Sequence, residues 1–179
     1  MKKYSNTLNK QSGFTLIEMA FALIIFGIMA AIVAPIVSST MSATEADAES
    51  KMTQSYYAGL KAKWRRGPYT GLNNAFVINA QIPDPSAVSG TTITNGWGGS
   101  VVFAAGTITG GVASGAKQIT NPVPPAACMA YATAMAPFVD ELIVGSTTVK
   151  AVGGTINPAT SATACNVTTA TVNVIMRKA

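Results

Sequence analysis

The stretch GFTLIEMAFALIIFGIMAAIVAPIV occupies residues 13–37 and sets how the rest of the chain can be organised. Its single charged residue is Glu18, and the other residues are apolar or small. As a helix, the uncharged run from Met19 to Val37 would span roughly 28 Å, close to the hydrocarbon thickness of a bilayer. We therefore expect a helix that can cross a membrane.

The residues ahead of this stretch indicate where the chain is cut. Lys2, Lys3 and Lys10 form a basic flank before the apolar run. An ordinary secretory signal is cut after its apolar segment, at small residues, and the segment is lost. Here the small-residue site, Gln11-Ser12-Gly13, lies before the apolar run. Cleavage there would remove the basic leader and leave the apolar helix on the mature protein.

The hexapeptide from Gly13 to Glu18, GFTLIE, resembles the class III prepilin signal of type IV pilins and their relatives. The resemblance implies cleavage between Gly13 and Phe14 by a prepilin peptidase on the cytoplasmic side, followed by methylation of the Phe14 amine by the same enzyme. Residues 1–13 would then be the leader peptide and residues 14–37 the transmembrane half of a long helix, which forms the filament core. No cleavage of the helix itself is implied.

Glu18 needs a physical explanation, because a carboxylate inside a membrane segment is costly without a partner or a function. The amine of Phe14 in the same chain is only four residues away. The resemblance implies that the partner is instead the Phe14 amine of a neighbouring subunit, so that Glu18 sets the axial register during assembly. The alternative is a glutamate held at the level of the lipid headgroups.

Gly27 and Pro35 weaken the helix between them, since glycine raises the entropic cost of helicity and proline removes a backbone hydrogen bond. Pro35 also falls where type IV pilins carry a helix proline. One interpretation is ordinary helix curvature. The other, which the resemblance suggests, is local melting of this stretch in the filament, which would make the fibre extensible.

Residues 38–66 have an amphipathic pattern that predicts a second helical half lying on a globular domain. The apolar stripe, with one residue in every four, consists of Ala48, Met52, Tyr56, Leu60 and Trp64. Residues 44–47 and Glu49 are expected to face the other way, and Gly67-Pro68 to end the helix. Four basic residues crowd its last turns: Lys61, Lys63, Arg65 and Arg66. They complement the helix dipole, although a site for an anionic ligand is the alternative.

Composition excludes several functional classes. The net charge of +5 falls to +2 without the three leader lysines, which argues against a nucleic-acid partner. The chain has no histidine and two cysteines, so it cannot build a Cys/His zinc site or a histidine-dependent triad. It also lacks a nucleophile elbow and a phosphate-binding loop. We therefore expect no enzyme activity, no metal and no cofactor.

Residues 67–179 are predicted to form a globular domain with an antiparallel sheet, which makes the fold class α+β. The β-prone segments are Ala75–Asn79, Ser100–Ala104, Thr107–Thr109 and Thr171–Met176. The prolines of residues 122–125 introduce an Ala-rich stretch, Ala126–Val144, which predicts a helix or two helices joined at Pro137. The stretches Ser86–Ala116 and Ser146–Ala164 are expected to be loops and edge strands on the outer surface of the filament.

Cys128 and Cys165 allow only one intramolecular disulfide. It would close a loop of about 38 residues and stabilise the fold by roughly 4 kcal/mol on the chain-entropy estimate. The alternative is two buried free thiols. Cys128 would lie on the Ala-rich helix and Cys165 just before the last strand, so the bridge would tie that helix to that strand.

Several segments of the domain resemble type IVb pilins, the bundle-forming and toxin-coregulated kind, including the major pilins of plasmid-encoded thin pili. The segments are residues 69–72, 81–84, 93–99, 126–128 and 164–165. The leader, with 13 residues followed by Phe14, is more like that of type IVa pilins. Within residues 95–99, Trp97 is expected to pack on the sheet, with exposure to a neighbouring subunit as the alternative.

The resemblance implies the type IV pilin fold, with a long N-terminal helix packed on an antiparallel sheet. The function it implies is that of the major structural subunit of a type IV pilus, which polymerises through this helix into a surface filament for adherence, aggregation or conjugation. The chain would be a single-pass inner-membrane protein before assembly and extracellular afterwards. The implied partners are other copies of the chain, the prepilin peptidase, an assembly ATPase, an inner-membrane platform protein and, in cells with two membranes, a secretin.

Two alternatives remain. A type II secretion pseudopilin would share the first forty residues. Major pseudopilins typically lack this cysteine pair and carry acidic calcium ligands near the C-terminus, whereas the only acidic residues here after Asp84 are Asp140 and Glu141. A minor tip pilin that acts as an adhesin or receptor is the second alternative.

Overall fold

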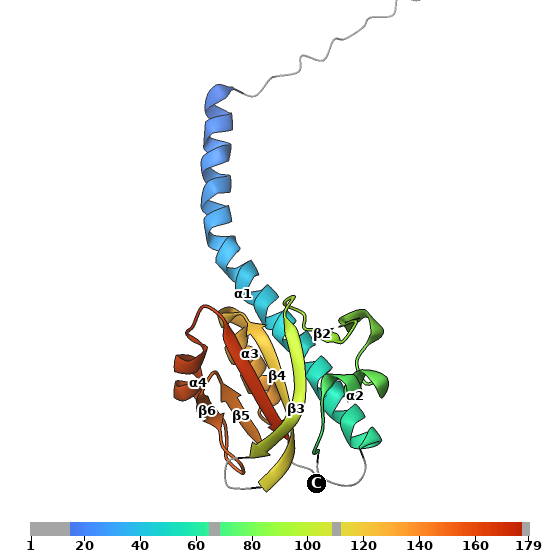
Figure 1. Cartoon of the computed structure of the whole chain (residues 1–179). Helices are drawn as coiled ribbons and strands as arrows, with labels where there is room; N and C mark the ends of the chain where they lie inside the picture. Colours follow the sequence, from blue (N-terminus) through green and yellow to red (C-terminus); the bar gives the residue numbers. More distant parts are fainter. Residues whose placement is uncertain (1–14, 65–68, 109–111, 177–179) are drawn as a thin grey trace, which may run out of the picture. The chain divides into compact units, whose positions relative to one another are not determined.

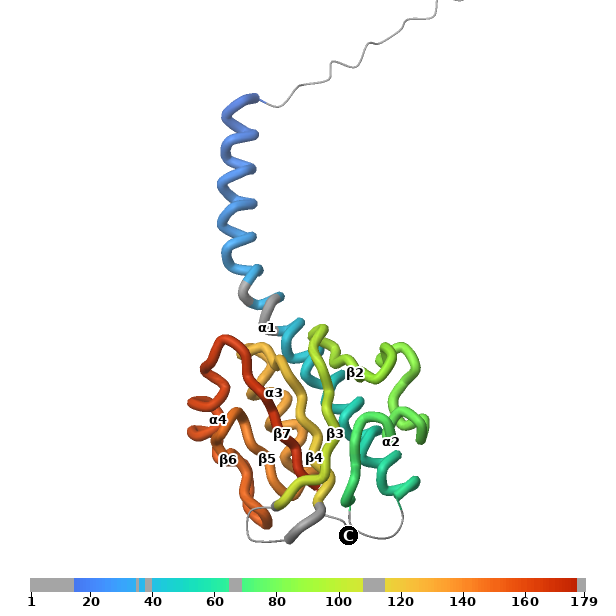
Figure 2. Tube along the Cα trace, viewed as in Figure 1, coloured from blue at the N-terminus to red at the C-terminus, as the bar shows by residue number. Residues whose placement is uncertain are grey.

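The computed structural model describes residues 15–64, 69–108 and 112–176. The chain forms two compact units, Met1–Ser38 and Ser39–Ala179. The first helix, α1 (Leu16–Lys63), contributes residues to both units. Figure 2 traces it in blue and cyan from the N-terminal side.

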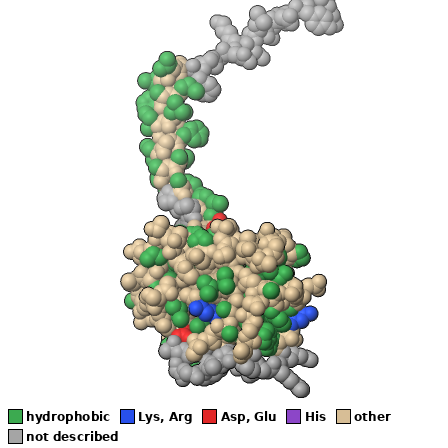
Figure 3. All heavy atoms as spheres, in the orientation of Figure 1, with side chains coloured by type: hydrophobic (Ala, Val, Ile, Leu, Met, Phe, Trp, Pro, Cys, Tyr) green, Lys and Arg blue, Asp and Glu red, His purple; other side chains and the backbone are tan. Residues whose placement is uncertain are grey.

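The described part of the first unit is the N-terminal half of α1. Its segment Leu16–Ala34 has 19 residues and a mean hydropathy of 2.6, and is long and apolar enough to cross a membrane. The large apolar side chains of this half are exposed, and hydrophobic side chains cover the helix in Figure 3. Exposed apolar surface of this extent needs lipid or other protein to cover it.

The second unit is built on one antiparallel sheet (Figure 1). In the described part of the chain this sheet has seven strands in the order β1-β2-β3-β4-β7-β5-β6. The strands are β1 (Val88–Ser89), β2 (Thr92–Thr94), β3 (Ser100–Ile108), β4 (Val112–Val123), β5 (Glu141–Val144), β6 (Thr147–Lys150) and β7 (Ala170–Met176). The helices are α2 (Asn74–Asn79), the 3-10 helix η1 (Pro85–Ala87), α3 (Pro125–Met135) and α4 (Pro158–Cys165). The predicted α+β class, with a long N-terminal helix and an antiparallel sheet, is confirmed.

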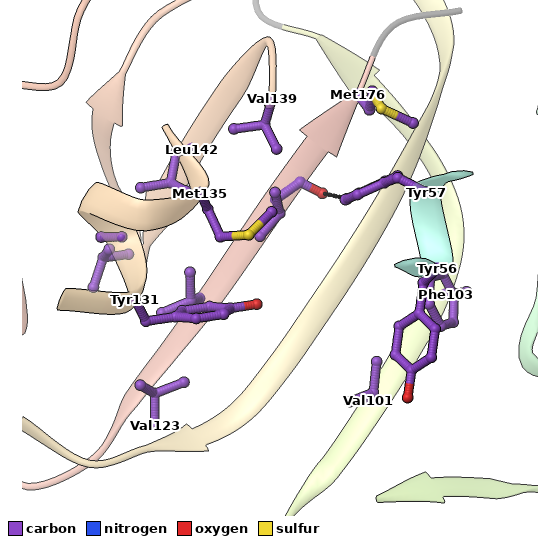
Figure 4. Packing of buried hydrophobic residues seen from close by; sticks show 14 of the residues in the cluster. Tyr56, Tyr57, Val101, Phe103, Val123, Tyr131, Met135, Val139, Leu142 and Met176 are labelled. Carbon is purple, nitrogen blue, oxygen red and sulfur yellow. Dashed lines mark hydrogen bonds between the residues drawn. The ribbon is translucent and has the colours of Figure 1, made fainter. Parts of the chain in front are cut away.

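The C-terminal half of α1 packs on the sheet. The ring of Tyr56 meets Phe103 of β3 edge-on, with centroids 5.6 Å apart. Tyr57 donates a hydrogen bond of 2.9 Å from its hydroxyl to the carbonyl oxygen of Val174 in β7, drawn as a dashed line in Figure 4. Both tyrosines are buried, so this half of α1 is anchored to strands on both sides of β4.

The predicted apolar stripe of this helical half is partly wrong. Tyr56 and Leu60 are fully buried, but Ala48 is exposed. Ala46 and Glu49, which were expected to face solvent, are 0% and 1% exposed. A strict four-residue repeat turns by about 40° per step around a helix of 3.6 residues per turn, so the predicted stripe leaves the buried face towards its N-terminal end.

The segment Ala75–Asn79, predicted to be β-prone, lies in helix α2. The side chain of Asn73 caps this helix by accepting a hydrogen bond of 2.9 Å from the backbone N–H of Phe76. The next residue, Asn74, bonds the backbone of β3, donating to the oxygen of Val101 and accepting from the nitrogen of Phe103. Asparagine capping therefore outweighs the β-propensity of Phe76 and its two successors.

The prediction of helix throughout Ala126–Val144 is also wrong. The helix α3 ends at Met135, and Glu141–Val144 forms strand β5 between β7 and β6. Pro137 lies two residues after the helix end, where proline cannot continue a helix. Pairing with two neighbouring strands then outweighs the local sequence preference.

The stretches expected to be loops and edge strands hold more structure than predicted. β1 and β6 are the two edges of the sheet, but β3 and β4 lie within it. β3 is one strand across both predicted β-segments, and Thr109 lies outside the described residues. The last strand is confirmed as β7.

Candidate assembly site

The N-terminal end of α1 is capped by a reciprocal pair of hydrogen bonds between Thr15 and Glu18. The backbone N–H of Thr15 donates to Oε2 of Glu18 at 2.9 Å, and the N–H of Glu18 donates to Oγ1 of Thr15 at 3.3 Å. The Thr15 hydroxyl also donates to Oε2, at 2.8 Å. This is a capping box, which satisfies backbone donors that a helix start leaves without partners.

The other residues predicted for processing and flexibility lie in and around this helix. Gly13 and Phe14, predicted to flank the cleavage site, lie outside the described residues. Gly27 and Pro35 both fall within α1, which is described as helix across them. A Cβ added at Gly27 would meet nothing within 4 Å. The structure therefore contains one continuous helix through the region expected to melt in a filament.

Glu49 joins the second half of α1 to the turn between β2 and β3. Its Oε2 accepts a hydrogen bond of 2.9 Å from the backbone N–H of Gly96, while Oε1 is buried without a hydrogen-bond partner. Burial raises the pKa of Glu49, an effect that the bond from Gly96 partly offsets. A carboxyl in this position fixes the turn on the helix.

The turn itself is organised by Asn95. Its Oδ1 accepts hydrogen bonds from the backbone N–H groups of Trp97 and Gly99, at 3.0 and 2.8 Å. Its Nδ2 donates to the oxygen of Pro122 at 3.3 Å. Gly98 has a φ of 76°, the left-handed conformation that glycine adopts without strain.

Trp97 packs inward, as predicted, but on α3 rather than on the sheet. Its ring meets that of Tyr131 edge-on, with centroids 5.7 Å apart. The hydroxyl of Tyr131 lies 2.9 Å from that of Thr53 in α1 and 3.4 Å from that of Thr120 in β4. Burial raises the pKa of Tyr131 to about 12, so its hydroxyl keeps its proton and can donate to either threonine. The shared contacts join α1, α3 and β4.

Gln118 of β4 completes this buried polar cluster. Its Nε2 donates to the hydroxyls of Thr53, at 3.0 Å, and Thr120, at 3.2 Å. Since Thr120 and Gln118 are two residues apart, they point to the same face of the sheet. Both α1 and α3 therefore cover that face.

Cys128 and Cys165 form a disulfide, with Cα atoms 5.6 Å apart. Cys128 lies on α3, as predicted, but Cys165 is the last residue of α4. The bridge therefore joins two helices rather than a helix and a strand, which corrects the prediction. The short helix α4 begins after Asn157, whose side-chain oxygen accepts a hydrogen bond from the backbone N–H of Thr160. Proline occupies the first helical position, where it is favoured.

The residues that sequence reasoning missed are Thr15, Glu49 and Tyr131. The Thr-x-x-Glu spacing of residues 15–18 was a visible signal for the capping box. Nothing local marked Glu49, because its partner Gly96 is 47 residues away.

At the C-terminal end of α1, Lys61 and Lys63 lie in the last turn as predicted, and Arg65 and Arg66 fall outside the described residues.

Metal-ligating groups do not gather in the described ranges: no three His, Cys, Asp or Glu side chains there lie close enough to hold an ion.

An open groove of about 700 Å³ lies between α4 and the β5–β6 turn. Its lining contains Thr147, Thr160, Thr163, Thr169 and Thr171 together with small and apolar residues, and no titratable side chain.

Comparisons with known proteins agree with this architecture. A family model described as PilS N terminal matches residues 43–177, and one described as a prokaryotic N-terminal methylation motif matches residues 8–34. Among solved structures, the chain is similar to the crystal structure of a type IV b pilin from Salmonella typhi, with 20% sequence identity and a TM-score of 0.58. That match covers 74% of this chain and 99% of the other. No curated protein matches the chain.

The two family matches together extend from the leader to the last strand, and the solved structure shares the fold of the domain. The chain therefore belongs to the PilS N-terminal family and, with its N-terminal methylation motif, is a type IV pilin.

Proposed function

We propose that this pilin is the major subunit of a type IV pilus and polymerises through the N-terminal half of α1 into a surface filament used for adherence, aggregation or conjugation. The main support is the exposed apolar segment Leu16–Ala34 on a chain of this family. Such a segment requires lipid or neighbouring helices around it. A filament core of sister helices supplies the second of these environments.

Membership of the type IV pilin family itself makes the chain a structural pilus subunit and not an enzyme. The methylation motif implies processing by a prepilin peptidase and assembly into filaments. The major role and the use of the filament go beyond this membership and form part of the proposal.

The peptidase would cut between Gly13 and Phe14 and methylate the Phe14 amine. The family match over residues 8–34 includes this bond and supports the assignment. Removal of residues 1–13 would leave α1 starting two residues after the new terminus. The leader would be lost and the apolar helix kept.

Glu18 would set the axial register by pairing with the Phe14 amine of a neighbouring subunit. Both hydrogen bonds that its carboxylate accepts from Thr15 end on Oε2. A carboxylate offers several lone pairs, so capping its own helix leaves capacity for an incoming ammonium group. The cap would also hold the side chain in a fixed orientation for that partner.

Assembly would begin from the inner membrane, where the apolar half of α1 anchors each subunit. Lipid already shields these side chains from water, so transfer into the filament gains little hydrophobic free energy. Extraction therefore requires external work, which an assembly ATPase and a platform protein would supply. Gly27 and Pro35 would provide local weakness in the helix once it leaves the bilayer.

The test is electron microscopy of fibres sheared from producing cells, combined with mass spectrometry of their main component. A major pilin is expected to dominate the fibres, with a mature terminus at Phe14. Trace amounts in fibres made of another protein would contradict the major role and indicate a minor tip pilin. Absence from fibres, together with loss of protein secretion on deletion, would indicate a pseudopilin.

A further inference from the structure

The turn between β2 and β3 begins with an Asn-Gly pair, Asn95-Gly96, and no other asparagine in the sequence precedes a glycine. Asparagine is a chemically labile residue. The backbone nitrogen of the next residue can attack its side-chain amide carbon and displace ammonia, which closes a succinimide ring. The reacting atoms belong to neighbouring residues, so their proximity is built into the chain. Glycine as the next residue has no Cβ to obstruct the attack.

The side-chain oxygen of Asn95 is already held by two backbone donors. Its Oδ1 accepts hydrogen bonds from the N–H groups of Trp97, at 3.0 Å, and Gly99, at 2.8 Å. Attack on the amide carbon moves negative charge onto this oxygen. Donors that point at the oxygen before the reaction stabilise that charge as it develops. The turn therefore has the arrangement that acyl-transfer sites use to bind an oxyanion.

The attacking nitrogen has a base in contact with its proton. The backbone N–H of Gly96 donates a hydrogen bond of 2.9 Å to Oε2 of Glu49, within the reach of about 2.6–3.2 Å that a general base requires. Among the residues that the structure describes, no cation forms an ion pair with Glu49, and its Oε1 is buried without a hydrogen-bond partner. Burial raises the pKa of Glu49, which makes its carboxylate a stronger base where it is ionised.

The leaving nitrogen is held only by a long bond, and the turn is open to water. Nδ2 of Asn95 donates to the oxygen of Pro122 at 3.3 Å, beyond the usual range for this kind of bond. Asn95 is 6% exposed, whereas Gly96 is exposed. Ammonia can therefore leave, and water can enter, from the side of Gly96.

We propose that Asn95 converts itself to a succinimide and then to aspartate or isoaspartate, with Glu49 as the general base and the two backbone N–H groups on Oδ1 as the oxyanion donors. The bond that forms joins the nitrogen of Gly96 to Cγ of Asn95, and the bond that breaks joins Cγ to Nδ2. The proton of Gly96 passes to Glu49 and then to the departing nitrogen, which leaves as ammonia. Water then opens the ring at either carbonyl group. The net reaction consumes water and releases ammonia.

The products weaken the contacts of this turn with α1 and β4. Aspartate replaces the donor Nδ2 by a carboxylate oxygen, which faces the oxygen of Pro122, and it adds a negative charge close to Glu49. Isoaspartate carries the main chain through Cγ, which displaces the N–H of Gly96 from Glu49. The modification is therefore a slow and irreversible loosening of the domain. It needs no second subunit, so it does not depend on the proposed function.

Ageing of the unaltered, detergent-solubilised full chain tests the proposal. Samples are kept folded in buffer or unfolded in urea at about pH 8, well above the ordinary pKa of glutamate. Mass spectrometry of digests then follows loss of the Asn95 amide. Loss is expected to be several-fold faster in the folded chain, because only the fold supplies the base and the oxyanion donors. Slower loss in the folded chain than in urea would show that the turn protects Asn95, and would overturn the proposal.

Asn74 is the internal control in the same digests. Its Nδ2 and Oδ1 also bond backbone groups, those of Val101 and Phe103, but the next residue is alanine. It is expected to keep its amide. Isoaspartate among the products of Asn95 separates from aspartate by chromatography and is expected, because direct hydrolysis of the amide gives aspartate alone. Aspartate alone would contradict the ring.

Substitutions identify the base. Glu49→Gln keeps an oxygen to accept from Gly96 but cannot take its proton, so it is expected to slow the loss several-fold in the folded chain and not in urea. Glu45→Gln, which changes an exposed acid on the same helix, is expected to match the unaltered chain. Gly96→Ala, whose added Cβ would lie 3.4 Å from Oε2 of Glu49, fits the turn and is expected to slow the loss in both states. An unchanged rate in folded Glu49→Gln would overturn the role of Glu49.

Discussion

Oε2 of Glu49 in α1 accepts a hydrogen bond of 2.9 Å from the backbone N–H of Gly96, across 47 residues of sequence. Glu49 is 1% exposed, and burial raises its pKa above the ordinary value of 4.5. A raised pKa in the folded state means that folding favours the protonated carboxyl. The contribution of Glu49 to stability is therefore greatest below pH 4.5 and falls as the pH rises through the folded pKa.

The substitution Glu49→Gln removes this titration and keeps an oxygen to accept from Gly96. We expect the free energy of unfolding of the unaltered chain, relative to that of the variant, to fall between about pH 4.5 and about pH 7. Urea titrations of the detergent-solubilised full chain at both values measure the difference. A relative gain in stability towards neutral pH would show that the carboxylate is the favoured form.

Gly99 lies where β3 begins to pair with the end of β4. A Cβ built there would overlap Cδ of Pro122 and the backbone oxygen of Asn121. Because backbone atoms cannot move aside cheaply, Gly99→Ala is expected to lower the free energy of unfolding by about 1–3 kcal/mol. Gly27→Ala, where an added Cβ meets nothing within 4 Å, is the control and is expected not to lower it, because alanine reduces the entropic cost of helicity. Equal stability of both variants would contradict the tight approach.

Local sequence patterns predict some elements of this fold well, whereas elements that depend on pairing between distant strands are not predicted. The apolar run before Pro35 and the β-branched last strand, β7, are strong local patterns, and the structure contains a helix and a strand there. The segment Glu141–Val144 was predicted to be helical because nothing in its sequence indicates that it pairs with β6 and β7. Strand pairing is a long-range effect, and it outweighs local propensity.

The residues of the candidate site show the same difference between local and long-range signals. Glu18 could be identified from a local motif, and its bond partner Thr15 is three residues away. Glu49 was assigned to the solvent side because it lies off the predicted four-residue apolar stripe. Its burial depends on a turn that joins β2 to β3, which a helical pattern alone cannot reveal.

The disulfide between Cys128 and Cys165 joins α3 to α4. Replacing Cys128 by serine is expected to lower the free energy of unfolding by roughly 4 kcal/mol on the chain-entropy estimate, and to lower subunit abundance in cells. Immunoblots and denaturant titrations measure the two effects. Cys165→Ser and the double substitution should match it, since each removes the same bridge. Unaltered abundance in all three would mean that the bridge is dispensable.

The proposed cleavage between Gly13 and Phe14 predicts strict selection for size at position 13. Gly13→Ala is expected to slow processing, and Gly13→Leu to block it, because a larger side chain hinders approach of the peptidase. The ratio of precursor to mature chain on gels and the N-terminal sequence of the product measure the effect. Ser12→Ala, next to the bond, is the control. A mature Phe14 terminus in the leucine variant would contradict the assignment.

Glu18 has two separable parts in the proposal: it caps α1 through Thr15, and it pairs with a neighbour. Glu18→Ala removes both and is expected to leave the chain processed and membrane-bound but without fibres. Thr15→Ala removes the side chain of the capping box, at a cost of about 1 kcal/mol, and keeps the carboxylate. We expect fibres from Thr15→Ala. Fibres from Glu18→Ala would remove its register role, whereas loss of fibres in both variants would assign the defect to the helix cap, because only the cap is common to the two.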